Sequence, residues 1–255
     1  MLFSLHNKKA VITGAGSGIG LAIAQVFAQQ GAEVHILDLN EATAQEAVQG
    51  IQSQGGKASA HACDVSNQAQ VKSVLQHIGP LDILVNNAGI AHIGTAETTS
   101  EADFDRVMNI NVKGVYNCLH AAIPLMKENG GGVILNMASI AATIGIPDRF
   151  AYSTAKGAVL TMTLATAKDY LKQNIRCNCI SPARVHTPFV DGYLAKNYPG
   201  QEAEMYEKLA QTQPIGRMAE PVEVAYLALF LCSDEAGFIT GCDYPLDGGF
   251  TRLNN

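Results

Sequence analysis

Short apolar runs alternate with amphipathic stretches along most of the chain. The first apolar run, residues 9–13, ends in a glycine-rich string, after which apolar residues recur at helical spacing until Gly31 closes the helix. Further apolar runs predict six more strands, at residues 32–37, 57–64, 81–85, 133–137 and 175–180 and within 238–249. These runs are apolar throughout rather than alternating, so we expect a parallel sheet covered by helices on both faces.

The amphipathic stretches predict further helices, at residues 41–54, 67–78, 101–126, 221–231 and in a segment that carries Tyr152 and runs to about Lys172. We expect the helix at 101–126 to break near its end, because Pro124 lacks an N–H for the helical hydrogen bonds. No linker, repeat or low-complexity segment divides the chain. Residues 1–255 are therefore expected to form one doubly wound α/β domain.

The glycine-rich string lies between the first strand and the first helix, which is the context in which such strings bind phosphate. Its four glycines, between residues 14 and 20, let a ligand approach the free N–H groups at the helix N-terminus. The second strand ends in Asp38, where the dinucleotide-binding motif has an acidic residue for the ribose hydroxyls. Its charge repels a 2′-phosphate, and neither Ala15 nor Leu39 supplies a cation, so the sequence favours NAD over NADP.

Polar residues also end later strands. Asp64 follows the third strand, and residues 86–89, Asn-Asn-Ala-Gly, follow the fourth. We expect Asp64 to meet the adenine ring and residues 86–89 to line the floor beneath the cofactor, because ligands of open α/β sheets bind at the carboxyl ends of strands. Each residue taken singly is equally explained as a turn or helix cap. Their joint position on one edge favours binding.

The strongest candidate chemistry lies at the end of the fifth strand and in the helix after it. Ser139 ends the strand, and Tyr152 and Lys156 share a helix face because they are four residues apart. An ammonium beside a phenol favours the phenolate, which lowers the pKa from ~10 toward neutrality. The alternative is an ordinary surface pair. Asn111 lies in a polar stretch of an otherwise apolar helix, where it either caps, faces solvent or holds a buried partner.

Composition limits the partners and the location. With a net charge of −6 and no basic cluster, the chain is not expected to bind nucleic acid or an anionic membrane. It shows no leader pattern and no apolar stretch that spans a bilayer, so we expect a cytoplasmic protein. Cys177 and Cys179 form a C-x-C pair without a second pair or a nearby histidine, so no metal is expected and buried thiols are favoured. The other four cysteines lie in apolar segments and are also expected to be buried thiols: Cys63, Cys118, Cys232 and Cys242.

Together these motifs resemble the short-chain dehydrogenase/reductase family over nearly the whole chain. Thr13 with the glycine string, the stretch 86–89, Asn111, Ser139 and the Tyr152–Lys156 pair stand in the family's order and spacing. The resemblance implies a Rossmann-type sheet of seven strands. It also implies an oxidoreductase that moves hydride between a nicotinamide and a carbinol or carbonyl carbon.

The resemblance also implies residue roles. Tyr152 exchanges the substrate proton, and Lys156 lowers the phenol pKa and binds the nicotinamide ribose. Ser139 hydrogen-bonds the substrate oxygen, and Asn111 holds a water that links Lys156 to solvent. The expected cofactor contacts are Gly14, Ser17, Gly18, Ile19, Gly20, Asp38, Leu39, Asp64, Val65, Asn87, Ala88, Gly89, Tyr152, Lys156, Pro182, Val185 and Thr187.

One departure from the family pattern follows the sixth strand. The family commonly has Pro-Gly where this chain has Pro182 and Ala183, so no backbone conformation restricted to glycine is expected there. The next residues, at about 188–213, are expected to form a small helical lid over the substrate.

Two arginines indicate the substrate class. Arg149 and Arg184 approach one pocket with His186 beside them, and converging guanidinium groups suit a carboxylate. The alternative is that each arginine faces solvent or pairs with an acid such as Asp148 or Asp191. The local sequence resembles the subgroup of cytosolic 3-hydroxybutyrate and sugar-acid dehydrogenases, including the 2-keto-3-deoxy-L-fuconate enzyme. We expect a small hydroxy acid or sugar acid, with a neutral sugar or polyol as the alternative.

Other classes of function stay open. A non-catalytic NAD-binding regulatory protein would share the fold, because fold and site are separable. An isomerase or dehydratase that uses NAD only transiently is a further alternative. The complete set of Asn111, Ser139, Tyr152 and Lys156 favours a dehydrogenase. Family analogy predicts a homotetramer.

Overall fold

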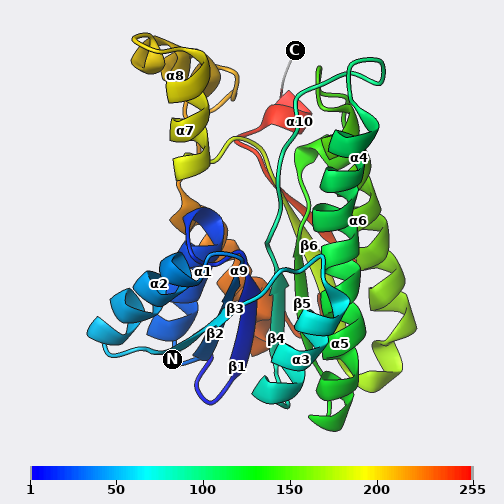
Figure 1. The fold of residues 1–255 in the computed structure, drawn as a ribbon. Coiled ribbons are helices and arrows are strands. Elements are labelled where there is room, and N and C mark those ends of the chain that lie inside the picture. Colours follow the sequence, from blue (N-terminus) through cyan, green and yellow to red (C-terminus); the bar gives the residue numbers. More distant parts are fainter. Residues whose placement is uncertain (1, 254–255) are drawn as a thin grey trace.

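In the computed structural model, which describes residues 2–253, seven parallel strands form one sheet in the order β3-β2-β1-β4-β5-β6-β7 (Figure 1). The strands are β1 (Lys9–Thr13), β2 (Glu33–Asp38), β3 (Lys57–Ala62), β4 (Ile83–Asn86), β5 (Gly132–Met137), β6 (Ile175–Pro182) and β7 (Asp243–Leu246). The chain winds outward from β1 in both directions, so the predicted doubly wound Rossmann-type sheet is confirmed.

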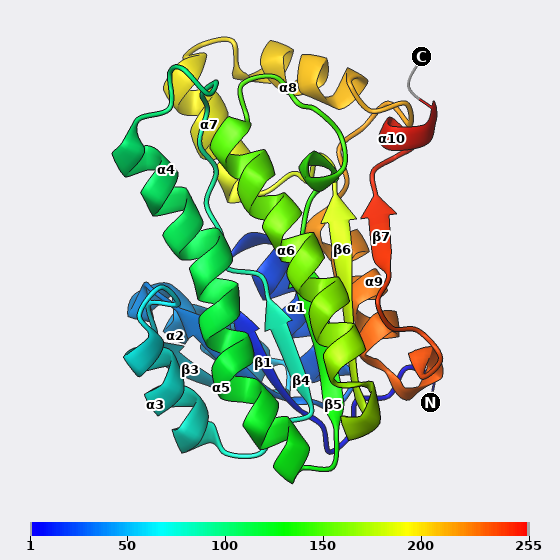
Figure 2. The same ribbon diagram turned by 90° about the vertical axis from the view of Figure 1, so that its right-hand side faces the viewer.

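Helices cover both faces of the sheet. One face carries α1 (Gly18–Gln29), α2 (Glu41–Ser53) and α9 (Pro221–Cys232). The other carries α3 (Gln68–Ile78), α5 (Gly114–Glu128) and α6 (Phe150–Asp169), which stand in front of the strands in Figure 2. Each layer buries its own apolar cluster against the sheet. The remaining α-helices are α4 (Glu101–Met108), α7 (Pro188–Asn197), α8 (Glu202–Gln211) and α10 (Phe250–Leu253).

The long helical segment differs from the prediction. It does not break at Pro124, which lies inside α5. Pro124 is exposed, and the carbonyl that it leaves without a helical donor belongs to His120, which is also exposed. The irregular turn lies earlier, where residues 109–113 form a single π-helical turn between α4 and α5.

Two smaller differences concern strands. The strand β3 is not apolar throughout, because it is an edge strand whose side chains are largely exposed or half-buried. The last strand is shorter than the predicted segment and begins only at Asp243. In the described part of the chain, none of the helices has the length and apolar character of a membrane span.

The cysteines mostly lie where predicted. Five are buried free thiols, including Cys177 and Cys179, which face the cluster under α6. Burial raises the pKa of the Cys63 thiol to about 11. Cys242 differs from the prediction, because it is only half-buried before β7. Within residues 2–253 no group of three or more His, Cys, Asp or Glu side chains is arranged to hold a metal ion.

Candidate active site

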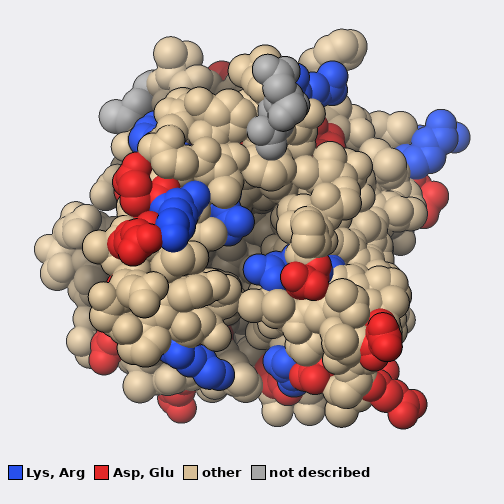
Figure 3. Space-filling model, turned by 90° about the horizontal axis from the view of Figure 1, so that it is seen from above, with Lys and Arg blue, Asp and Glu red and all other residues tan. Residues whose placement is uncertain are grey.

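The carboxyl ends of the strands bring the predicted residues to one edge of the sheet. This edge is at the top of Figures 1 and 2, beneath α7 and α8. Seen from above, it is hollowed, with several basic groups around the hollow (Figure 3). Open α/β sheets bind their ligands at this edge.

The turn between β1 and α1 is built for close backbone approach. Gly14 has a φ of +61°, and a Cβ there would lie 2.8 Å from Ala88 Cα. Gly18 has a φ of +56°, and a Cβ there would lie 3.5 Å from the methyl group of Thr187. A Cβ at Gly20 would collide with the Gly14 carbonyl. The turn therefore tolerates only glycine at these positions and exposes the N-terminus of α1.

Thr13 ties the glycine turn to the stretch after β4. Its Oγ1 accepts hydrogen bonds from the N–H groups of Asn87 and Ala88, both at 3.0 Å. The Asn87 amide donates to the carbonyls of Thr13 and Gly14, both at 3.0 Å. Gly89 then lies against Asn111, whose Oδ1 would be 3.2 Å from a Cβ at that glycine. The predicted phosphate turn and the predicted cofactor floor are thus one bonded unit.

The adenosine end is marked by Asp38. Its carboxylate accepts the N–H groups of Gly16 and Asn40, both at 3.0 Å, which hold it beside the glycine turn. Leu39 is 75 % exposed. Asp64 is half-buried, and its Oδ1 accepts from the Ser66 hydroxyl and N–H. This arrangement fits an adenosine ribose at Asp38.

Other expected cofactor contacts surround the same turn. Ser17 is the N-cap of α1, with an extended backbone and no side-chain cap, and Ile19 is half-buried in the first turn. Val65 is buried after β3. Pro182 ends β6, and Val185 bridges to Ala219.

A hydrogen bond to a main-chain carbonyl holds the Lys156 side chain near Tyr152 and Ser139. Its Nζ donates to the Met137 carbonyl at 2.7 Å and lies 5.7 Å from the centre of the Tyr152 ring. Ser139 Oγ accepts the Ala141 N–H at 3.2 Å and donates to the Pro182 carbonyl at 3.5 Å. The α6 helix and the end of β5 thus bring the hydroxyl, the phenol and the amine together.

The pKa values in this group differ from the sequence expectation. Burial raises the pKa of the Tyr152 phenol, while a hydrogen bond to Ser139 and the charge of Arg149 act in the opposite direction. Burial lowers the pKa of Lys156 to about 8. The predicted lowering of the phenol pKa by the amine is not the dominant effect in this structure, because the enclosed site penalises both charges.

Asn111 lies in the π-helical turn and is 1 % exposed. Its Nδ2 donates to the Ile90 carbonyl and its Oδ1 accepts the Ile90 N–H, both at 2.8 Å. It is therefore neither a cap nor a solvent-facing residue. Its side chain fixes the chain after Gly89 beside Lys156, whose Nζ would be 3.7 Å from a Cβ at that glycine.

Arg149 and Arg184 lie close enough for their charges to interact, as predicted for the substrate pocket. Burial and the charge of Arg149 lower the pKa of Arg184. The Arg149 guanidinium donates to the Asp148 carbonyl at 3.0 Å, and Arg184 Nε donates to Thr212 Oγ1 at 2.9 Å. Among the ion pairs of residues 2–253, none includes either guanidinium.

His186 is engaged elsewhere. Its Nε2 lies 2.8 Å from Asp191 Oδ1, and its ring packs edge-on against Tyr206 of α8 at 5.0 Å. Of the two acids named as alternative partners for the arginines, Asp191 is therefore paired with His186, and Asp148 offers Arg149 only its main-chain carbonyl. These contacts fasten α7 and α8 to the end of β6.

Sequence reasoning missed several groups. Thr13 was recognised only as part of a motif, although its hydroxyl joins the two segments predicted to bind the cofactor. Thr212 orients Arg184 from far along the chain, and the Met137 partner of Lys156 is a backbone carbonyl. No sequence signal identifies such a carbonyl, because every residue has one. Ala183 does conform to expectation, since it is absent from the residues with positive φ.

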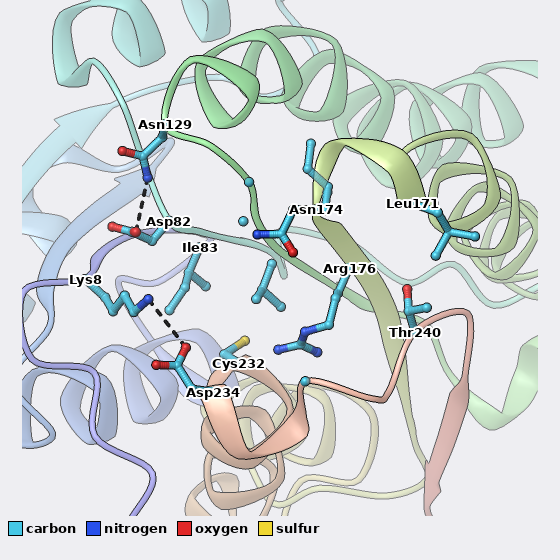
Figure 4. Close-up of a pocket in the computed structure, with 15 residues that line it drawn as sticks. Lys8, Asp82, Ile83, Asn129, Leu171, Asn174, Arg176, Cys232, Asp234 and Thr240 are labelled. Carbon is cyan, nitrogen blue, oxygen red and sulfur yellow. Dashed lines mark hydrogen bonds and ion pairs between the residues drawn. The ribbon is translucent and has the colours of Figure 1, made fainter.

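A cavity of about 350 Å³ lies away from these groups, at the amino-terminal edge of the sheet (Figure 4). Its charged groups are occupied with neighbours. Lys8 pairs with Asp234 at 3.4 Å, and Asn129 donates to Asp82 at 3.1 Å. The Arg176 guanidinium donates to the carbonyls of Leu231, Ser233 and Ile239. These bonds join β6 to the end of α9, so this cavity is assigned a structural role.

Comparisons with known proteins agree with this geometry. A family model described as enoyl-(acyl carrier protein) reductase matches residues 14–251. An uncharacterized oxidoreductase of Thermotoga maritima is 43 % identical, covering 98 % of this chain and 100 % of that protein. The 2-keto-3-deoxy-L-fuconate dehydrogenase of Xanthomonas campestris is 36 % identical over 97 % of this chain and 81 % of its own. The structure of L-sorbose reductase from Gluconobacter frateurii, complexed with NADPH and L-sorbose, superposes with a TM-score of 0.95 at 31 % identity, covering 99 % and 100 % of the two chains.

Proposed function

Because the chain belongs to the short-chain dehydrogenase/reductase family, we propose that it is an NAD-dependent oxidoreductase acting on a small hydroxy acid or sugar acid. The family relationship makes it an oxidoreductase for alcohol or sugar-type substrates. The choice of NAD, the acidic substrate and the residue roles are our proposal. The observation that carries it is a pair of neighbouring arginines, Arg149 and Arg184, that make no ion pair within residues 2–253 and of which Arg149 acts on Tyr152.

Tyr152 is proposed as the acid/base. When bound, the nicotinamide accepts or supplies the hydride. Tyr152 takes the hydroxyl proton during oxidation and returns it during reduction, because loss of hydride from carbon requires loss of a proton from its oxygen. Ser139, which hydrogen-bonds the phenol, binds the same oxygen. These two hydroxyl groups hold the reacting bond at the end of β5.

Lys156 and Asn111 support the proton transfer. Lys156 Nζ has three donors, of which one is used by the Met137 carbonyl. We propose that the others serve the nicotinamide ribose, and that the charge on Nζ, 5.7 Å from the centre of the Tyr152 ring, stabilises the phenolate. Asn111 keeps the segment after Gly89 in place beside Lys156. We propose that a water held here connects Lys156 to solvent.

The preference for NAD rests on Asp38. Its carboxylate is already oriented by the N–H groups of Gly16 and Asn40, so it cannot swing away from an incoming 2′-phosphate without losing both bonds. The Asp38 carboxylate therefore stays in place, where its charge repels the 2′-phosphate of NADP. The rival is NADP, which the L-sorbose reductase relative binds in its reduced form. Steady-state kinetics with each cofactor separate the two.

The acidic substrate rests on Arg149 and Arg184. Both arginines are half-buried, and the charge of Arg149 acts together with burial to lower the pKa of Arg184. We propose that a substrate carboxylate supplies the counter-charge. The sugar-acid dehydrogenase relative supports this class. The rival is a neutral sugar, as the name of L-sorbose reductase indicates for that relative.

A substrate panel tests the proposal. Hydroxy acids, aldonates, neutral sugars and secondary alcohols are offered with NAD and with NADP, and nicotinamide reduction is followed by absorbance. We expect the highest kcat/KM for an acid with NAD. Turnover restricted to neutral sugars would overturn the acidic class, and complete lack of nicotinamide binding would overturn the enzyme proposal. Light scattering of the purified protein tests the predicted homotetramer, and cell fractionation tests the predicted cytoplasmic location.

A further inference from the structure

Three polar side chains are enclosed in the apolar core between the sheet and α6. Asn86 of β4 is 3 % exposed, and Asn136 of β5 and Thr163 of α6 are both 0 % exposed. Asn86 Nδ2 donates to Asn136 Oδ1 at 2.8 Å, and Asn136 Nδ2 donates to Thr163 Oγ1 at 2.9 Å. Thr163 Oγ1 in turn donates to the Val159 carbonyl at 2.9 Å. A continuous chain of hydrogen bonds thus runs from β4 through β5 into the helix.

The apolar contacts around this chain do little to fix the helix along its axis. The α6 side chains that face the sheet are mostly small, such as Ala155, Val159 and Ala167. Small side chains without deep interdigitation tolerate sliding, whereas a buried hydrogen bond weakens within a few tenths of an ångström and leaves costly unpaired groups. The Asn136–Thr163 bond and the Lys156–Met137 bond are therefore the two buried directional contacts that limit sliding of α6 along β5.

Each connected segment presents one part of the active site. Asn86 begins the stretch that ends in Gly89 beside Asn111. Asn136 immediately precedes Met137, whose carbonyl accepts Lys156 Nζ. Thr163 lies seven positions after Lys156. That spacing is about two helical turns, so both side chains lie on one face of α6.

We propose that Thr163 and Asn136 are positioning residues that set the axial position of α6, and with it the placement of Tyr152 and Lys156 against Ser139 and the nicotinamide. The inference rests on the proposed dehydrogenase function for its kinetic consequence. Its structural consequence, the position of α6 along β5, does not depend on that function. Both side chains are fully buried in the core below the strand ends, so we expect their effect on the reaction to pass through the backbone of α6 and β5.

The kinetic test uses Thr163→Val, which keeps the shape of the side chain and removes only the hydroxyl. We expect kcat for the best substrate of the panel to fall about 10-fold to 100-fold, as small misplacements of catalytic groups do. KM for NAD should change much less than kcat, because the glycine turn is untouched and only the proposed contact of Lys156 with the nicotinamide ribose is displaced. The kcat–pH profile for oxidation should move to higher pH, since a displaced Lys156 stabilises the phenolate less. Thr163→Ser, which restores the hydroxyl, should return both values to within about two-fold of wild type.

Thr161→Val is the matched control. Thr161 lies on the exposed side of α6, and its hydroxyl donates only to the Gly157 carbonyl at 3.2 Å. The same substitution there removes the same kind of intrahelical bond without a link to the sheet. It should leave kcat and the pH profile unchanged. Equal losses in Thr161→Val and Thr163→Val would overturn the positioning role.

A crystal structure of Thr163→Val tests the inference without relying on activity. We expect α6 to be displaced along β5 and the contact between Lys156 Nζ and the Met137 carbonyl, 2.7 Å in the native protein, to lengthen. An unchanged contact would overturn the inference even if the wild-type protein oxidised every alcohol in the panel. A displaced helix in a protein that shows no dehydrogenase activity would support the positioning role and count against the proposed function alone.

Discussion

Replacing Lys156 by methionine should make the folded protein more stable at neutral pH while abolishing its activity. Lys156 is 6 % exposed, and its pKa of about 8 lies below the ordinary value of 10.5 because burial opposes its charge. A shift of that size corresponds to about 3 kcal/mol against the charged form at pH 7. Methionine has a similar length and no charge. It leaves the Met137 carbonyl without its donor, at a cost of about 1 to 2 kcal/mol.

The net gain at pH 7 is therefore about 1 to 2 kcal/mol, which raises Tm by about 4 °C for a chain of this size. The pH dependence follows from the lowered pKa. Between pH 8 and 10.5 the unfolded chain binds more protons than the folded one, so the wild-type protein gains stability as pH rises and its penalty has largely gone by pH 10. Lys156→Met should then lose its advantage over wild type at pH 10.

Thermal unfolding measures Tm and urea unfolding measures the free energy of unfolding, each at pH 7 and pH 10 and at one protein concentration. Lys168→Met is the control, because Lys168 lies exposed on the same helix. Its Tm should stay within about 1 °C of wild type at both pH values. A Lys156→Met variant that is less stable than wild type by the same amount at pH 7 and pH 10 would refute the reasoning, since the amine would then stabilise the fold by packing alone.

Three further predictions concern binding. Asp38→Ala should raise kcat/KM for NADP by about 10-fold and lower it for NAD, because the charge that opposes the 2′-phosphate is gone; an unchanged cofactor ratio would contradict this. Gly14→Ala should abolish NAD binding in a fluorescence titration, since its φ of +61° and the 2.8 Å approach to Ala88 leave no room for a Cβ, whereas Gly50→Ala, with nothing within 4 Å of the added Cβ, should bind normally. Arg149→Ala and Arg184→Ala should each raise KM for acidic substrates by about 10-fold or more and leave KM for neutral alcohols unchanged; an equal change for both classes would count against carboxylate binding.

The sheet and its ligand-binding edge were predictable because they depend on local signals. Three of these signals are apolar runs of strand length, a glycine-rich turn and Asp38 at the end of the second strand. Each depends only on residues close by in the sequence. The same signals placed Ser139, Tyr152 and Lys156 together, since a strand end and a helix face fix their directions. The seventh strand was less well defined, because it has only four residues, all of which pair with β6.

The remaining features depend on distant contacts. Whether Pro124 breaks a helix depends on which side of α5 faces solvent. The partner of His186 is Asp191, and the anchor of Arg184 is Thr212, which lies in another segment of the chain. The raised pKa of Tyr152 depends on burial of its phenol by the segments that surround it. The residues next to Pro124, His186, Arg184 or Tyr152 in the sequence do not reveal any of these contacts.

The central claim is that Tyr152 transfers the substrate proton next to a bound nicotinamide, and Tyr152→Phe tests it most directly. With the best substrate of the panel and saturating NAD, kcat should fall by about 10²-fold to 10⁴-fold, while the dissociation constant for NAD stays within about two-fold of wild type. A variant that turns over at the wild-type rate would contradict the account.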